Sequence, residues 1–277
     1  MFGCSWLIAQ DVCHIWELGG GSLYTNLIET PLSADKLMST AVVLVVDLAR
    51  PERLWSTVTS LVASVAEYIA AALKTEQARN LKMEERLEKE ALARVGSDHG
   101  DIDHIRPFPL PLLLLGGQYD VFQDFEPEKK KLICRSLRYL AHLHGATLQF
   151  YSARDSGLVK KARDLLSHHG FASPPGKGMS QDYNKPLIIP PGSDSFQAIL
   201  GGTGEVPKLE VMRHQFGTHF PQEEEETLTR SDDPAKDPNF KEAEVDMLRG
   251  QKDEDLERYR REAERRQRSW GDIDMDA

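Results

Sequence analysis

Three short apolar runs, each followed by a helix-forming segment, constrain the fold of this chain most strongly. The runs are AVVLVVDLA (residues 41–49), LPLLLLGGQYD (110–120) and ATLQFYSARDS (146–156), and the first two are nearly continuous in Val and Leu. Strands of a parallel sheet that is covered on both faces have this composition. Because helical segments separate the strands, their order predicts an α/β domain with a mostly parallel sheet and flanking helices.

Helical periodicity marks the segments between these runs. Residues 52–95 follow Pro51 without another Gly or Pro, which predicts one long helix or two end to end. Its first half has an apolar face that can pack on the sheet, whereas its second half is dominated by charge and is predicted to project into solvent. Residues 127–144 and 157–171 have the periodicity of two further helices.

One more strand is predicted before these three. The run DVCHIW (residues 11–16) is apolar enough for a strand and ends at ELGGGS, where glycines allow a sharp turn. We therefore expect an α/β domain over residues 1–172. Residues 173–238 contain proline pairs and little periodicity, and are predicted to form an irregular, extended linker.

The last part of the chain, residues 239–277, is predicted to be a charged helix with one thin apolar stripe. Residues 221–277 hold 19 acidic and 11 basic residues, so eight of the ten net negative charges lie there. The stripe is narrow enough to lie on a partner but too narrow to form a core. We expect its partner-binding residues to be Val245, Leu248, Leu256 and Tyr259.

Composition excludes several classes of function. An acidic chain without a basic stripe argues against nucleic-acid binding. The N-terminus lacks the basic start of a signal peptide, and no run approaches the roughly 18 apolar residues of a membrane span, so we expect no membrane insertion. Three scattered cysteines (Cys4, Cys13 and Cys134) favour a reducing compartment and are predicted to be small buried apolar residues.

The loop GSDHGDIDHIRPFPLP (residues 96–111) could supply metal ligands. A polar connection is the favoured interpretation, because a turn-rich loop has no helix or strand to fix ligand geometry. We therefore predict no metal and no cofactor. The alternative, a metal site, would use Asp98, His99, Asp101, Asp103 and His104.

Ligands of such sheets bind beyond the carboxyl ends of the strands, so the turns there are the candidate site. In Ras-like GTPases these turns carry Asp-x-x-Gly, Asn-Lys-x-Asp and Ser-Ala-Lys. Here Glu17 and Gly20 keep the spacing of the first motif, Asp120 keeps the last position of the second, and Ser152 begins a Ser-Ala-Arg that resembles the third. The fold is thus predicted to be Ras-like with a degenerate nucleotide site.

The phosphate loop is missing from this pattern. No Gly-x-x-x-x-Gly-Lys-Ser/Thr occurs, and GKG at residues 176–178 follows prolines and opens no helix. Without that cradle, neither phosphate affinity nor magnesium coordination has a source, so we predict that the chain is not an enzyme. The alternative is a GTP-binding switch or a hydrolase of the small-GTPase type.

The motifs WELGGG (16–21), LVVDLARPERLW (44–55), YDVFQDF (119–125), NKPLIIPPGSDSF (184–196) and the terminal segment from residue 233 closely resemble the light intermediate chains of cytoplasmic dynein 2. The resemblance implies a non-catalytic motor subunit that docks on the dynein heavy chain, with its terminal helix adding to the contact. It further implies a role in retrograde intraflagellar transport and cilium assembly, in the cytoplasm and cytoskeleton, at the cilium axoneme and the basal body. A cargo-adaptor contact of the terminal helix is the alternative.

The family has an N-terminal segment with the first strand, a phosphate-loop-like turn, the first helix and the second strand. The resemblance implies that this sequence starts just before the third strand. Either MFGCSWLIA (residues 1–9) substitutes for the central strand, or the sequence is an incomplete or shortened form, which is the interpretation we favour.

Overall fold

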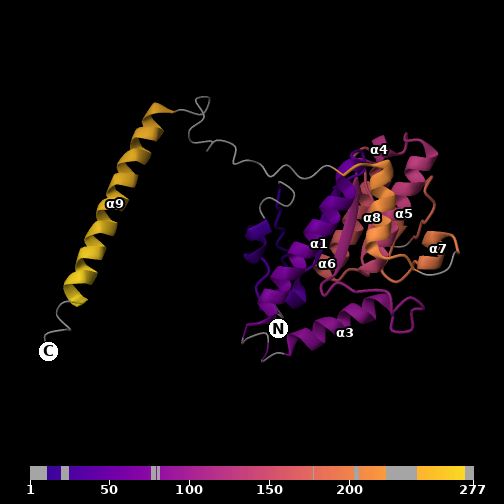
Figure 1. Ribbon diagram of the computed structural model, residues 1–277, viewed down its shortest axis with the longest axis horizontal. Coiled ribbons are helices and arrows are strands. Elements are labelled where there is room, and N and C mark those ends of the chain that lie inside the picture. The colour runs from indigo at the N-terminus through magenta and orange to yellow at the C-terminus, as the bar shows by residue number, and fades with distance from the viewer. Residues whose placement is uncertain are drawn as a thin grey trace, which may run out of the picture. The chain divides into compact units, whose positions relative to one another are not determined.

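The computed structural model describes residues 11–19, 25–75, 79, 82–176, 178–202, 206–222 and 242–271. The chain separates into two compact units, Met1–Glu226 and Thr227–Ala277. The first unit contains the sheet and most of the helices, and the second contains the single described helix α9 (Ala243–Gly271) (Figure 1). The predicted α/β class is confirmed.

Four strands form the sheet, in the order β1-β2-β3-β4. The first three, β1 (Val42–Asp47), β2 (Leu112–Gly117) and β3 (Thr147–Phe150), are parallel, and β4 (Ile188–Ile189) is antiparallel to β3. All four residues of β3 are buried, as expected for a strand between two neighbours. The sheet is therefore mostly parallel, as the three apolar runs predicted.

Three helices form where periodicity predicted them: α1 (Pro51–Leu73), α5 (Pro127–Leu143) and α6 (Ser156–Phe171). Pro stands at the start of both α1 and α5, where its missing N–H costs no hydrogen bond. The side chain of Asp155 caps α6 by accepting from the backbone N–H groups of Gly157 and Leu158. Helix α8 contacts both α1 and α5, as expected when right-handed crossovers place these two helices on the same face of the sheet.

By length and composition alone, α1 could cross a membrane, contrary to our expectation from the sequence. A core helix of a soluble domain passes the same test, and α1 packs on β1. Its buried residues recur at helical spacing along one face: Pro51, Leu54, Trp55, Val58, Val62, Val65 and Ile69. This face covers Leu44 and Val46 of β1, so packing on the sheet accounts for its apolar composition.

Two predictions about strands are wrong. Residues 11–19 form no strand, and their side chains are exposed, with exposed fractions of 73% for Val12 and 84% for Ile15. The apolar residues Val12, Ile15 and Trp16 do not alternate, so no single face of a strand could bury them. In addition, β1 is covered on one face only, because Val43 and Val45 are 37% and 63% exposed.

The charged second half of residues 52–95 does not project into solvent. It forms a separate helix, α3 (Met83–Val95), after Lys82 adopts a left-handed backbone conformation with φ of 47°. Figure 1 shows α3 lying across one end of the domain at a steep angle to α1. Four side chains spaced by four residues are buried against the core, and they anchor the helix: Met83, Leu87, Ala91 and Val95.

Part of the segment predicted to be irregular is ordered. After β4, the chain forms α7 (Phe196–Leu200) and α8 (Leu209–His219). Phe216 of α8 is buried, and its ring centroid lies 5.9 Å from that of Trp55 of α1. These helices were missed because they are short and their stability comes from packing on α1 and α5 rather than from their own sequence.

Residues after α8 fix the start of α1. The side-chain oxygen of Gln222 accepts from the backbone N–H groups of Trp55 and Ser56, 3.1 and 3.2 Å away. The side-chain nitrogen of Gln222 also donates to the carbonyl of Pro51 over 3.1 Å, so this residue ties the segment after α8 to the first turns of α1. Short helices complete the described unit: η1 (Thr25–Glu29), η2 (Leu37–Ser39) and α4 (Tyr119–Phe122). Residues 177, 203–205 and 223–238 of the predicted linker, and residues 239–241 and 272–277 of the predicted terminal helix, lie outside the described residues.

Candidate functional site

The carboxyl ends of β2 and β3 bring two predicted site residues together. The hydroxyl of Ser152 donates to Asp120 Oδ1 over 2.7 Å, and Arg154 Nη1 lies 3.1 Å from Asp120 Oδ2. Ser152 is only 2% exposed, whereas the side chain of Arg154 is 84% exposed. Both carboxylate oxygens of Asp120 therefore already have partners within this chain.

The backbone of the β2 turn is held in an unusual conformation. Gln118 has φ of 57°, and its side-chain amide donates to Asp47 Oδ2 over 3.0 Å, which ties the end of β2 to the end of β1. A Cβ at Gly116 would lie 2.9 Å from side-chain atoms of both Leu48 and Phe150, so these buried side chains would have to shift to admit any other residue. The turn is thus built to pack closely.

This arrangement does not resemble an open nucleotide pocket. The hydrogen bond from Ser152 is the main cause that lowers the pKa of Asp120, so the carboxylate is ionised and satisfied within the fold. Two surface hollows of about 290 and 340 Å³ lie beside α1 in the described part of the chain. Neither hollow is lined by Asp120 or Ser152.

The remaining two residues of the predicted nucleotide site are not brought to these strand ends. Glu17 is exposed in the segment without secondary structure, and Gly20 lies outside the described residues. Within the described part of the chain, no hydrogen bond or ion pair joins Glu17 to the strand-end cluster. Cys13 of the same segment lies close to Gly170 near the end of α6 and is exposed, whereas the sequence predicted that it would be buried. A shared site for Glu17 and Asp120 therefore has no support in the contacts described.

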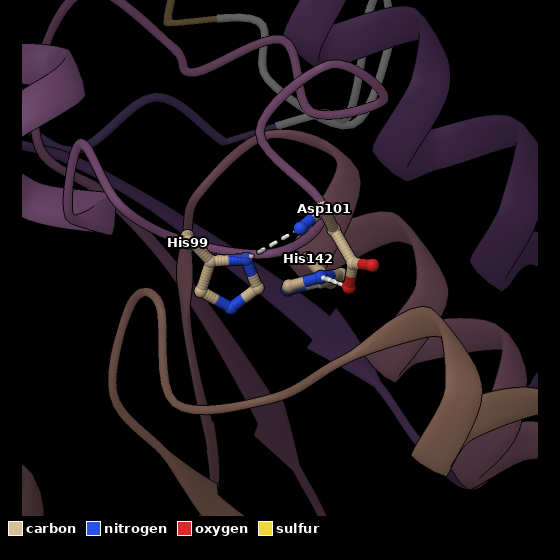
Figure 2. Close-up of side chains that lie close together, drawn as sticks. All are labelled: His99, Asp101 and His142. Atoms are coloured by element: carbon tan, nitrogen blue, oxygen red, sulfur yellow. Dashed lines mark hydrogen bonds and ion pairs between the residues drawn. The ribbon is translucent and has the colours of Figure 1, made fainter.

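A second cluster lies in the loop for which metal ligands were considered. His99, Asp101 and His142 place one donor atom each within 4.8 Å of one another (Figure 2). His142 Nε2 donates to Asp101 Oδ2 over 2.8 Å, and the backbone N–H of Asp101 donates to His99 Nδ1 over 3.1 Å. The other candidate ligands of the loop, Asp98, Asp103 and His104, are exposed outside this cluster.

Two further elements orient this cluster. The backbone N–H of Phe196, at the start of α7, donates to Asp101 Oδ2 over 2.8 Å. His99 Nε2 donates to the backbone carbonyl of Asp194 over 3.0 Å. Our reason for setting aside a metal site, the lack of a helix to fix ligand geometry, is therefore wrong, because α5 carries His142 and α7 positions Asp101.

Asp194 is itself held by a buried ion pair. Arg138 Nε and Nη2 reach the two carboxylate oxygens at 2.7 and 2.6 Å, and the side chains are 12% and 3% exposed. Bidentate geometry makes such a pair strong and directional. The ion pair locks the turn before α7 against α5, so the groups around His99 and Asp101 have fixed positions.

The predicted partner-binding residues all lie exposed on α9. The exposed fractions of Val245, Leu248, Leu256 and Tyr259 are 56%, 56%, 49% and 65%. At about 100° per residue, the four side chains fall within an arc of about 80°. The charged residues around them pair within the helix, as Arg261 and Glu257 do over 2.8 Å. An apolar stripe on an otherwise charged helix is the form in which helices enter partner grooves.

Sequence reasoning missed His142, Arg138 and Asp194. Their contacts in this cluster join residues 41 to 95 positions apart, so no local spacing relates them. His142 was the one residue of the three that could have been noticed, because it lies in a helix with strong apolar periodicity. The structure shows that it is buried, and a buried histidine requires hydrogen-bond partners.

The first unit is an α/β domain with a mostly parallel sheet, and the carboxylate of Asp120 at its strand ends is paired with side chains of the same chain. Residues 9–101 match the family model described as "Dynein light intermediate chain (DLIC)". The fold is similar to that in the "Crystal Structure of the Dynein Light Intermediate Chain's Conserved Domain". That match has a TM-score of 0.51 and 17% identity, and covers 73% of this chain and 72% of the other.

Curated relatives extend the match to nearly the whole chain. "Cytoplasmic dynein 2 light intermediate chain 1" of Homo sapiens is 37% identical over 279 residues, covering 97% of this chain and 78% of that protein. The protein of the same description from Rattus norvegicus is 36% identical with the same coverage, and that from Danio rerio is 37% identical, covering 96% and 76%. The chain belongs to the dynein light intermediate chain family, and its resemblance to the cytoplasmic dynein 2 branch is confirmed.

Proposed function

We propose that this chain is a non-catalytic light intermediate chain subunit of the cytoplasmic dynein 2 complex. In this proposal it docks on the dynein heavy chain and supports retrograde intraflagellar transport and cilium assembly. It acts in the cytoplasm and cytoskeleton, at the cilium axoneme and basal body. Family membership over nearly the whole chain supports the assignment to the complex.

The exposed stripe of α9 is the observation that carries the docking part of the proposal. The four apolar side chains are about half exposed and lie along one face of α9, whereas the apolar faces of α1 and α5 are buried. Burying each of them in a partner groove is worth about 1 to 2 kcal/mol, which is enough for a specific contact when the four act together.

A paired substitution tests this contact. Leu248→Glu with Leu256→Glu places two carboxylates in the stripe, and we expect recovery of the heavy chain with the tagged subunit to fall at least tenfold. The matched control is Ala243→Glu with Met247→Glu, which adds the same charge to exposed positions on the opposite side of the helix from the stripe. Equal recovery with both pairs would show that the stripe takes no part in docking.

The non-catalytic part of the proposal rests on the strand-end cluster. Asp120 is satisfied by Ser152 and Arg154, and the sequence contains no phosphate loop. A titration of the purified chain with GTP should therefore give no saturable binding in the micromolar range. Saturable binding that is lost in Asp120→Ala would instead identify the chain as a GTP-binding switch.

A further inference from the structure

We propose that His99, Asp101 and His142 form a binding site for one divalent transition-metal ion of the zinc class. The donor set contains two imidazoles and one carboxylate, which suits zinc and its neighbours rather than magnesium or calcium. The site lies at the end of α5, and its ligands come from the loop before β2 and from α5 itself.

The spacing of the three donor atoms fits such an ion. Zinc bonds of about 2.0 to 2.1 Å place tetrahedral ligand atoms about 3.4 Å apart. The donor atoms here lie within 4.8 Å of one another, and His142 Nε2 and Asp101 Oδ2 are 2.8 Å apart. Side-chain shifts of about 1 Å therefore bring all three to a common centre. A water molecule then completes the four-coordinate set.

The surroundings of His99 have the form found around metal-bound histidines. Its Nε2–H donates to the backbone carbonyl of Asp194, which leaves the lone pair of Nδ1 on the side of Asp101 and His142 (Figure 2). Histidines that bind metals usually donate their second N–H to a carbonyl or carboxylate in this way. Because Arg138 holds the carboxylate of Asp194, the acceptor does not move when the ion binds.

Binding replaces two of the hydrogen bonds described. The proton on His142 Nε2 moves to Nδ1, and the backbone N–H of Asp101 releases His99 Nδ1, while the bond from Phe196 to the carboxylate is retained. No oxidation or bond cleavage is involved. The ion ties the loop at His99 and Asp101 to α5, so its role is structural and separate from the strand ends at Asp120.

The test uses the whole chain, stripped of metal with a chelator and titrated with Zn²⁺ by calorimetry, with the bound metal counted after dialysis. We expect one ion per chain. His99→Ala, His142→Ala and Asp101→Asn should each weaken binding at least about tenfold. Co²⁺ bound to the wild-type chain should have the visible absorption of a tetrahedral site, and His142→Ala should lose it.

Two controls distinguish this site from surface binding. His104→Ala removes an exposed histidine of the same loop, and His169→Ala breaks an adjacent histidine pair on α6; both should bind zinc like the wild type. Circular dichroism identifies any variant that fails to fold. If the variants do not fold, the number of zinc ions retained per wild-type chain tests the proposal by itself. Failure of the wild-type chain to retain zinc, or loss of binding only in His169→Ala, overturns the proposal and leaves the cluster as a hydrogen-bonded tie.

Discussion

Helices α5 and α9 are both rich in charged residues and both carry an apolar stripe, yet their surroundings differ completely. In α5, the stripe is buried against the sheet, and Ile133, Leu137 and Leu140 are at most 2% exposed. In α9, none of the side chains described is buried, and the apolar ones are half exposed or more. An apolar stripe on a charged helix therefore becomes part of the core where the same chain covers it. It becomes a binding surface where another molecule must cover it.

Removing one partner of an ion pair should change the free energy of unfolding far more in α5 than in α9, and this is the largest difference that we expect between the two helices. Arg138→Met in α5 leaves the carboxylate of Asp194 buried without its bidentate partner, and should cost about 3 to 5 kcal/mol in the free energy of unfolding. The matched variant in α9 is Arg258→Met, which removes an exposed partner of Asp255 and should cost less than about 1 kcal/mol. Urea unfolding measures both, and equal losses would contradict the comparison.

Leucine truncation compares the two stripes directly. Leu137→Ala leaves a cavity in the core and should lower the free energy of unfolding by about 2 to 5 kcal/mol. Leu248→Ala removes a side chain that is already 56% exposed, and should change the stability of the isolated chain by no more than about 0.5 kcal/mol. A large loss at Leu248 would mean that α9 packs on the first unit.

The end of α5 should make stability depend on pH. Burial is the main cause that lowers the pKa of His144 from its ordinary 6.5 to about 4. Between these values the unfolded chain takes up a proton that the folded chain does not, so stability is full above pH 6.5 and is lost as the pH falls toward 4. The loss from this group should be about 2 to 3 kcal/mol.

Unfolding in urea at pH 7 and pH 4.5 measures this loss. His144→Gln should make the difference between the two pH values smaller, whereas His104→Gln, at an exposed position, should leave it unchanged. An unaltered pH dependence in His144→Gln would show that this histidine is not the group responsible.

The smallest effect concerns Gly250 within α9. A Cβ at this position would meet no atom within 4 Å, so Gly250→Ala adds helix propensity without a clash. The gain of about 1 kcal/mol should raise helix content in circular dichroism and tighten heavy-chain binding by up to about fivefold. Weaker binding would indicate that the partner approaches the backbone closely at this glycine.

Much of the first unit could be predicted from the sequence, because its strands and helices have strong periodicity. The β1, β2 and β3 runs and the α1, α5 and α6 segments lie where apolar spacing placed them, and so does α9 of the second unit. The strand predicted at residues 11–16 was wrong because it was inferred from apolar composition alone, without testing whether apolar and polar residues alternate. The prediction that the charged segment of α3 projects into solvent was wrong. Four apolar residues at four-residue spacing are enough to anchor a helix to the core, even when most of its residues are charged.

The sites were less predictable than the fold. Asp120 and Ser152 could be related because both follow parallel strands, whose carboxyl ends share one edge of the sheet. The cluster of His99, Asp101 and His142 could not, because His142 joins it through the packing of α5 against a distant loop. Spacing along the chain carries no information about such contacts unless the elements between them are already placed.

Hydrogen exchange of the subunit, alone and within the assembled cytoplasmic dynein 2 complex, tests most directly whether the stripe of α9 is a partner surface. The backbone amides of residues 245–259 should exchange quickly in the free chain and much more slowly in the complex, while those of α5 are protected to the same extent in both. Equally fast exchange of residues 245–259 in both states would contradict the account, because the stripe would then remain uncovered in the motor.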